Sequence, residues 1–183
     1  LHPLLSPSWE GSGRVEAAGD GPTIVAPARL AGRLNRQFPM DRTRQYFTFV
    51  YGVFDESQGR FDYVLAGHPA PILLPRTGPP APLHGSGLPI GMIENATFDD
   101  ETVILQPGDR LYFYTDGVAE ALDASEQEFG SLRLLAEIDR LRDLPLREGL
   151  DHVANLVQDW SGGRLRDDVS LLAVERMDSS STA

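Results

Sequence analysis

The order of the apolar segments constrains the fold of this chain more than any other feature. Between residues 46 and 115, short aromatic and β-branched segments alternate with turns rich in Gly and Pro, a pattern typical of antiparallel strands. Between residues 131 and 161, apolar side chains instead recur at helical spacing, and one more strand-like segment follows at 169–175. Strands, then helices, then one returning strand favour an α+β fold in which helices pack on a largely antiparallel sheet.

The same spacing predicts the individual elements. The predicted strands are 46–55, 61–66, 72–74, 102–105, 110–115 and 169–175, and the predicted helices are 27–38, 132–142 and 145–161. Pro27 and Pro145 open two of these helices, and Ser131 is the expected N-cap of the third. In the turn before the strand 110–115, Pro107 and Gly108 suit the two central positions of a type II turn.

The sequence also predicts how the chain is organised. We expect one domain over 1–176, with a mobile Gly-rich loop at 6–26, a Pro/Gly-rich loop at 76–91 and a polar tail at 177–183. The first five residues include no Met and no basic stretch before an apolar one, which indicates the interior of a longer chain without a signal peptide. No apolar run approaches the roughly 18 residues of a membrane span. We therefore expect a cytoplasmic protein that does not bind membranes.

The composition excludes several kinds of site. The chain has no Cys, so disulfides, thiolate catalysis and Cys-based zinc sites are excluded. All 16 basic residues are Arg, which excludes the lysine of a P-loop, of a kinase or of a Schiff base. The net charge of -11 disfavours binding to nucleic acid or to anionic membranes. An acidic protein can still act on a phosphorylated substrate when bound cations screen the site.

Two acidic motifs lie at the ends of predicted strands. Asp116 follows one strand directly and precedes Gly117, so that a rigid strand holds its carboxylate where the chain turns away. Asp167 and Asp168 precede the last strand, and their like charges repel unless a cation or solvent intervenes. If both strand ends meet at one edge of the sheet, they form an oxygen-ligand site for Mg²⁺ or Mn²⁺. Neither motif is specific by itself, because Asp-Gly turns and acidic loops are common.

Seven short motifs follow one another along the chain. They are FTFVYGVFD (47–55), AGHPAP (66–71), GLPIG (87–91), LQPGD (105–109), YTDGVAEA (114–121), FG (129–130) and DDVSLL (167–172). In this order they resemble the bacterial SpoIIE-like branch of the type-2C (PPM) metal-dependent serine/threonine protein phosphatases. The resemblance extends from about residue 27 to residue 175.

This resemblance implies a fold and a mechanism. The fold is an αββα sandwich of largely antiparallel sheets flanked by helices, here truncated at the N-terminus. A binuclear Mg²⁺ or Mn²⁺ site at one end binds the phosphate of a phosphoserine or phosphothreonine and activates a water for attack. By the match of motifs, Asp116 and Asp167 are the expected metal ligands, catalytic through the bound metal. Asp168 is expected beside them, supporting the ligands without contacting the metal directly.

The sequence departs from the family at its start. Relatives carry an acidic Gly-Asp motif and an Asp-Val-Ser-Gly-His-Gly-like stretch that supply further ligands, and neither is present in this chain. Asp20-Gly21 is the only local candidate for a replacement, but it lies in a Gly-rich loop with no preceding apolar strand, where such residues more often form turns. Because affinity for hard cations rises with the number of ligands, two carboxylates bind one cation weakly. We expect little or no phosphatase activity from this chain alone and metal-dependent activity from the complete domain.

The resemblance also implies a place in bacterial sigma-factor signalling. The expected substrate is a phosphorylated protein of the anti-sigma-factor antagonist type. A fused sensor or receiver domain and a second copy of the chain are further expected partners. The runner-up hypothesis belongs to another class of function: a catalytically dead, phosphatase-like module for regulation and interaction, which would explain the absent ligand motifs.

Overall fold

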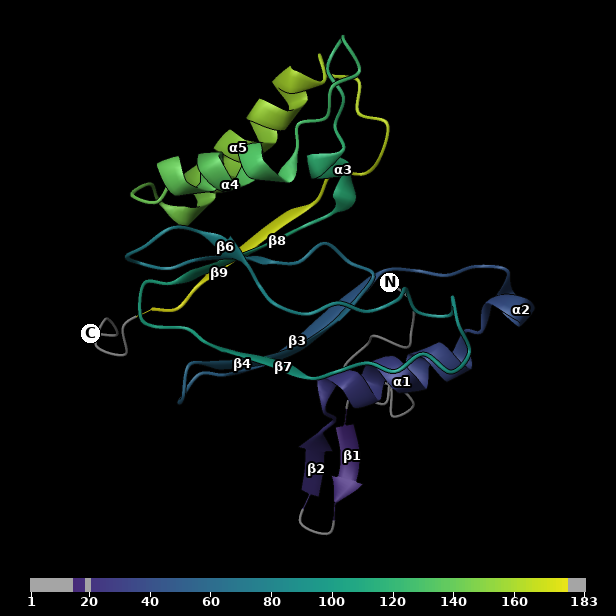
Figure 1. Cartoon of the computed structure of the whole chain (residues 1–183). Helices are drawn as coiled ribbons and strands as arrows, with labels where there is room; N and C mark the ends of the chain where they lie inside the picture. Colours follow the sequence, from purple (N-terminus) through teal and green to yellow (C-terminus); the bar gives the residue numbers. More distant parts are fainter. Residues whose placement is uncertain (1–14, 19–20, 178–183) are drawn as a thin grey trace. The chain divides into compact units, whose positions relative to one another are not determined.

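The computed structural model describes residues 15–18 and 21–177 (Figure 1). The density of contacts along the chain divides it into two compact units. Unit 1 comprises Leu1–Glu56, Arg60–His68 and Gly85–Val103, and unit 2 comprises Ser57–Gly59, Pro69–His84 and Ile104–Ala183. The prediction of one domain over 1–176 is not tested by this division and stays a prediction.

Unit 1 contains a three-stranded sheet, two helices and a separate hairpin. Its elements are β1 (Val15–Ala18), β2 (Gly21–Ile24), α1 (Pro27–Gln37), α2 (Met40–Thr43), β3 (Phe49–Asp55), β4 (Arg60–Ala66) and β7 (Glu101–Ile104). The sheet order is β3-β4-β7, and β3 and β4 form an antiparallel hairpin. Leu30 and Leu34 on α1 are buried against Val64 on β4. Burying side chains of this size contributes about 1.5–3 kcal/mol each.

Unit 2 contains the second sheet and the remaining helices. Its elements are β5 (Ile72–Leu74), β6 (Ala81–Pro82), β8 (Arg110–Tyr114), α3 (Asp116–Ala119), α4 (Ser131–Arg140), α5 (Leu146–Trp160) and β9 (Leu171–Glu175). The strand order is β6-β5-β8-β9, with every neighbouring pair antiparallel. Helices α4 and α5 cover one face of this sheet (Figure 1). Leu134, Ile138, Val153 and Val157 on these helices are almost fully buried, as their spacing predicts.

Most predicted elements are confirmed, with ends that differ by up to three residues. The predicted strand 46–55 begins only at Phe49, and the predicted strand 169–175 begins at Leu171. The turn at Pro107-Gly108 is confirmed, because Gly108 has the positive φ of 86° that position i+2 of a type II turn requires. The α+β class with antiparallel sheets is therefore correct.

Several local predictions are wrong. The segment 6–26, predicted as a loop, contains the antiparallel hairpin of β1 and β2. The segment 76–91 contains the short strand β6, which pairs with β5. Ser131 is the first residue of α4 rather than its cap: the N-cap is Gly130, and no side-chain cap bond forms there. Helix α3 follows β8 where only a turn was expected.

Some predictions fall on residues outside the described part of the chain. These are the assignments for residues 1–14, for Asp20 and for the tail after Met177. Among the helices of the described residues, none is long and apolar enough to cross a membrane.

Candidate metal site

The acidic motifs emerge at one end of the sheet in unit 2. Strands β8 and β9 are antiparallel, and Tyr114, the last residue of β8, pairs with Leu171, the first residue of β9. The residues that follow Tyr114 and those that precede Leu171 therefore leave the sheet at the same end. We call the five residues Thr115, Asp116, Gly117, Asp167 and Asp168 the acidic end.

Thr115 ties the two segments of the acidic end together. Its backbone N–H donates to the carbonyl of Ser170 at 3.1 Å. Its hydroxyl donates to the carbonyl of Asp168 at 2.8 Å and accepts from the N–H of Ser170 at 2.9 Å. A net contribution of about 1 kcal/mol for each such bond is typical. The threonine side chain thus continues the pairing of β8 and β9 beyond the last strand residues.

Gly117 allows a close approach between the same segments. A Cβ atom at this position would lie 2.6 Å from the carbonyl oxygen of Asp168 and 3.4 Å from the Cβ of Asp167. A real side chain does not fit at the shorter distance, so only glycine permits this backbone contact. Gly117 lies inside α3, so the Asp-Gly pair serves here for close packing rather than as a hairpin turn.

The carboxylates of the acidic end have few protein partners. Asp116 Oδ1 accepts the N–H of Gly117 at 3.0 Å, and Asp167 Oδ1 accepts the N–H of Asp168 at 2.7 Å. No Arg or His of the described residues forms an ion pair with Asp116, Asp167 or Asp168. Since no ion pair with a described residue offsets these like charges, a bound cation would relieve their repulsion.

A hollow of about 250 Å³ borders the acidic end. Asp167 and Gly117 line it together with Glu120, Glu128 and Arg166. Across the described part of the chain, no three His, Asp or Glu side chains are grouped closely enough to hold a metal ion. The donor chemistry fits a hard cation, because Mg²⁺ and Mn²⁺ prefer carboxylate oxygens as ligands. The carboxylates of the acidic end come from two strand ends.

The sequence pattern missed the residues that position the carboxylates. Thr115 and Gly117 act through contacts with residues more than 50 positions away, and no local rule predicts those contacts. Glu120 and Glu128 were also missed, and their only signal was the density of acids between residues 116 and 128.

Comparisons with known proteins bear on this arrangement. The sequence matches the family model described as "Stage II sporulation protein E (SpoIIE)" over residues 15–177. The chain belongs to the SpoIIE family. It is 30% identical over 138 residues to Protein IcfG of a Synechocystis strain, covering 72% of this chain and 21% of that protein. It is 36% identical over 101 residues to the phosphoserine phosphatase RsbP of Bacillus subtilis, covering 52% of this chain and 25% of RsbP.

Solved structures confirm the predicted fold. The SiaA-PP2C domain of Pseudomonas aeruginosa superposes with a TM-score of 0.69 at 19% identity, covering 82% of this chain and 61% of that one. The fold is therefore that of PP2C-type phosphatase domains. The chain spans only about a fifth to a quarter of the length of IcfG and RsbP. These comparisons assign no role to single residues. Asp116 and Asp167 therefore stay predicted metal ligands, and Asp168 stays a predicted neighbour of these ligands.

Proposed function

We propose that the acidic end binds a divalent cation, Mg²⁺ or Mn²⁺, and takes part in the hydrolysis of phosphoserine or phosphothreonine in a protein. The observation that carries this proposal is the convergence of Asp116 with Asp167 and Asp168 at one end of β8 and β9. The similarity to RsbP, a phosphoserine phosphatase by name, supports the class of reaction.

Each residue of the acidic end has a proposed task. Asp116 and Asp167 offer the carboxylate oxygens that would hold the cation. Asp168 orients Asp167, because its N–H donates to Asp167 Oδ1. Thr115 and Gly117 hold the two segments together, which would let the two carboxylates share one ion. When bound, such a cation supplies charge to the phosphoryl oxygens and an activated water, which the very slow hydrolysis of phosphate monoesters requires.

The completeness of the site sets the expected activity. Two carboxylates are fewer ligands than a binuclear centre needs, so further ligands would have to come from outside the described residues. We propose that the 183-residue chain alone binds one cation weakly and turns over little substrate. The protein as its gene encodes it would then show Mn²⁺- or Mg²⁺-dependent activity.

The family supports a proposal for the substrate and the partners. We propose a phosphorylated protein of the anti-sigma-factor antagonist type as the substrate, with a sensor or receiver domain as the source of regulation. The second candidate function is a catalytically dead module for interaction. One observation favours it: within the described residues, no third carboxylate or imidazole joins the acidic end as a ligand.

One experiment separates the two functions. Hydrolysis of p-nitrophenyl phosphate and of a phosphoserine peptide is measured as Mn²⁺ is titrated into the protein as its gene encodes it. The expected result is Mn²⁺-dependent turnover that Asp116→Asn lowers on the order of 10²-fold or more. Asp151→Asn, on an exposed position of α5, is the matched control and leaves turnover unchanged.

Two results would decide against catalysis at the acidic end. Turnover that needs Mn²⁺ but survives Asp116→Asn would place the reaction elsewhere. A folded protein with no turnover at any Mn²⁺ concentration would favour the interaction module.

A further inference from the structure

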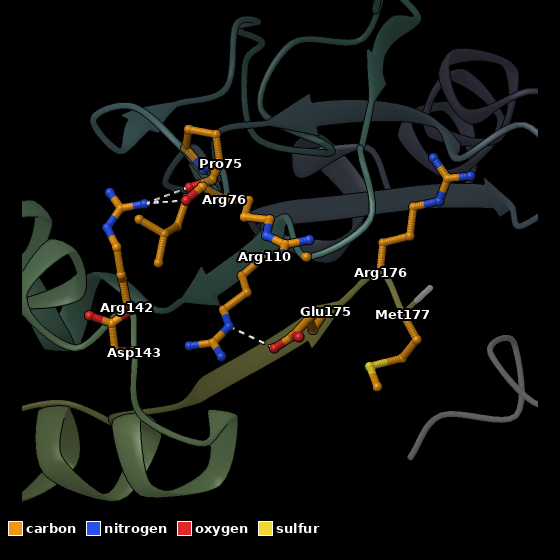
Figure 2. A pocket seen from close by; sticks show the side chains of 10 residues that line it. Pro75, Arg76, Arg110, Arg142, Asp143, Glu175, Arg176 and Met177 are labelled. Atoms are coloured by element: carbon orange, nitrogen blue, oxygen red, sulfur yellow. Dashed lines mark hydrogen bonds and ion pairs between the residues drawn. The ribbon is translucent and has the colours of Figure 1, made fainter. Parts of the chain in front are cut away.

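A cavity of about 350 Å³ lies in unit 2 at the other end of the same sheet. Four arginines line it, with two acidic residues among them (Figure 2). They are Arg76, Arg110, Arg142 and Arg176, and the acids are Asp143 and Glu175. We call this cavity the arginine pocket. Its lining carries an excess of positive charge, although the chain as a whole has a net charge of -11.

Arg110 brings a buried donor that lacks an acceptor. Its side chain is 11% exposed, and its Nε donates to Glu175 Oε2 at 2.7 Å. Its Nη1 is buried and has no hydrogen-bond partner among the described residues. Burial alone would lower the pKa of this guanidinium, but interactions with Glu175 and Tyr112 outweigh it, so the pKa is raised and the charge is kept. A buried charged donor without an acceptor is costly, which indicates a missing partner.

Hydrogen bonds hold the backbone of Arg76 in place beside the pocket. Its N–H donates to Asp109 Oδ1 at 2.8 Å, and its carbonyl accepts from Arg142 Nη1 at 3.1 Å. The aliphatic part of its side chain packs against Gly108, where an added Cβ would lie 3.0 Å from Arg76 Cδ. The guanidinium itself forms no hydrogen bond with any described residue.

The other two arginines, Arg142 and Arg176, donate hydrogen bonds to backbone carbonyls. Arg142 donates to the carbonyls of Pro75 at 2.7 Å and Gly78 at 2.6 Å, which fixes the loop that carries Arg76. Arg176 donates to the carbonyl of Leu105. The guanidinium of Arg76 and Nη1 of Arg110 are thus donors of the arginine pocket that no described residue accepts.

We propose that the arginine pocket binds a small oxyanion of the phosphate class between Arg76 and Arg110. Guanidinium groups match phosphate oxygens in geometry and charge, and hydrogen bonds between charged partners are the strong ones. An oxyanion would separate the charges of the two arginines, and a rotation of the Arg110 guanidinium would let it accept the Nη1 donor, which is buried in this structure. The cavity volume is sufficient for a phosphate with its waters or for a phosphate carried on a side chain.

This site is distinct from the acidic end. Arg110 is the first residue of β8 and pairs with Glu175, the last residue of β9, whereas Tyr114 pairs with Leu171 next to the acidic end. Four residues along a strand span about 13 Å, so one phosphate cannot reach both sites. The inference therefore does not depend on the proposed catalysis.

The test is calorimetric titration of inorganic phosphate into the protein as its gene encodes it, with EDTA present and ionic strength held constant by chloride. EDTA removes divalent cations, so phosphate cannot bind at the acidic end through a metal. The expected result is saturable binding that Arg76→Ala weakens about tenfold or more, because one charge-assisted contact is lost. Arg140→Ala is the matched control, since Arg140 is exposed on α4 and outside the pocket.

A second variant changes affinity in the opposite direction. Glu175→Gln removes the negative charge that competes for Arg110, so phosphate should bind a few-fold more tightly. A purely structural role for these residues would not produce effects of opposite sign. Arg76 is exposed and Glu175 is partly exposed, so both variants should fold, which circular dichroism checks.

The same assay distinguishes the source of the phosphate. Tighter binding of O-phosphoserine than of inorganic phosphate, again weakened by Arg76→Ala, would identify a phosphorylated side chain as the ligand, whereas binding of inorganic phosphate without binding of O-phosphoserine would identify a free anion. Absence of saturable binding of either, or equal affinity in the wild-type protein and Arg76→Ala, would overturn the proposal.

Discussion

The two ends of the sheet in unit 2 use the same kinds of charged residues in opposite ways. At the acidic end, Asp116 and Asp167 each accept one N–H from the next residue and have no ion pair within the described chain. At the other end, both oxygens of Asp109 accept backbone N–H groups, and Glu175 pairs with Arg110. There it is the arginines that keep uncommitted donors.

This difference separates structural acids from candidate ligands. Asp109 is 5% exposed, and a buried carboxylate persists only when its oxygens have partners. Asp116 is exposed and can exchange water for a cation at little cost. An acidic residue is therefore able to bind a ligand when its carboxylate oxygens still lack protein partners. The presence of an acidic residue alone does not indicate this.

The largest expected effect separates the two neighbouring aspartates. Asp167→Asn should lower Mn²⁺-dependent kcat/KM by on the order of 10²–10³-fold, the size typical of losing one electrostatic group in an active site. Asp168→Asn should cost about tenfold or less, because its backbone N–H to Asp167 remains and only a supporting charge is lost. Steady-state kinetics at saturating Mn²⁺ measures both. Equal losses would show that the two residues have the same role.

A smaller effect is expected from the close approach at the acidic end. Gly117→Ala places a Cβ 2.6 Å from the Asp168 carbonyl, so the segments must separate, at a cost of about 1–3 kcal/mol. Mn²⁺ affinity should fall, while phosphate binding in the arginine pocket should not change. The matched control is Gly149→Ala in α5, where the nearest atom to an added Cβ is 3.9 Å away. Urea unfolding and Mn²⁺ titration measure the two effects, and a Gly117→Ala protein that resembles the Gly149→Ala control would refute the contact.

The converse variant acts at the other end of the sheet. Asp109→Asn replaces an acceptor oxygen with an NH₂ group that faces a backbone N–H, which should lower the free energy of unfolding by about 1–2 kcal/mol. Because Arg76 is anchored by Asp109, phosphate affinity should fall as well. Mn²⁺ affinity should stay as in the wild-type protein. A loss of Mn²⁺ binding in this variant would contradict the independence of the two ends.

The smallest expected effect concerns alkaline pH. Burial raises the pKa of Tyr114, the last residue of β8, above its ordinary value of 10. Above pH 10 the unfolded chain loses the phenol proton while the folded chain keeps it, so stability falls as pH rises through the raised pKa. Tyr114→Phe should therefore lose stability less steeply above pH 10 and differ little at pH 7, as urea unfolding at several pH values can measure.

Tyr63 in unit 1 provides the comparison for this titration. Burial, and then the charge of Glu101, raise the pKa of Tyr63 to about 12. Tyr63→Phe should therefore also reduce the alkaline loss of stability, and the wild-type slope should exceed that of either variant. A slope unchanged in both variants would show that neither phenol titrates differently on unfolding.

Local rules predicted the parts of this fold that depend on neighbouring residues. Leu30 and Leu34 share one helix face, so their spacing was sufficient to predict the helix. The turn at Gly108 requires a positive φ, which glycine adopts readily, so the residue type was sufficient there. The hairpin of β1 and β2 was missed because strands of four residues containing Gly, Pro and Ala have low β propensity.

The candidate sites were only half predictable for the same reason. Asp116 and Asp167 were identified from their places beside predicted strands and from the family motifs. Thr115 could not be identified, because its role depends on a pairing with residues 53 and 55 positions away. The arginine pocket was missed because Arg76 and Arg110 become neighbours of one cavity only when β5 pairs with β8.

Electron paramagnetic resonance on the protein as its gene encodes it measures directly whether the acidic end binds Mn²⁺. We expect Asp116→Asn and Asp167→Asn each to weaken Mn²⁺ binding by at least about tenfold, while Asp151→Asn binds as the wild-type protein does. Unchanged Mn²⁺ affinity in both Asp116→Asn and Asp167→Asn would contradict a cation site at the acidic end.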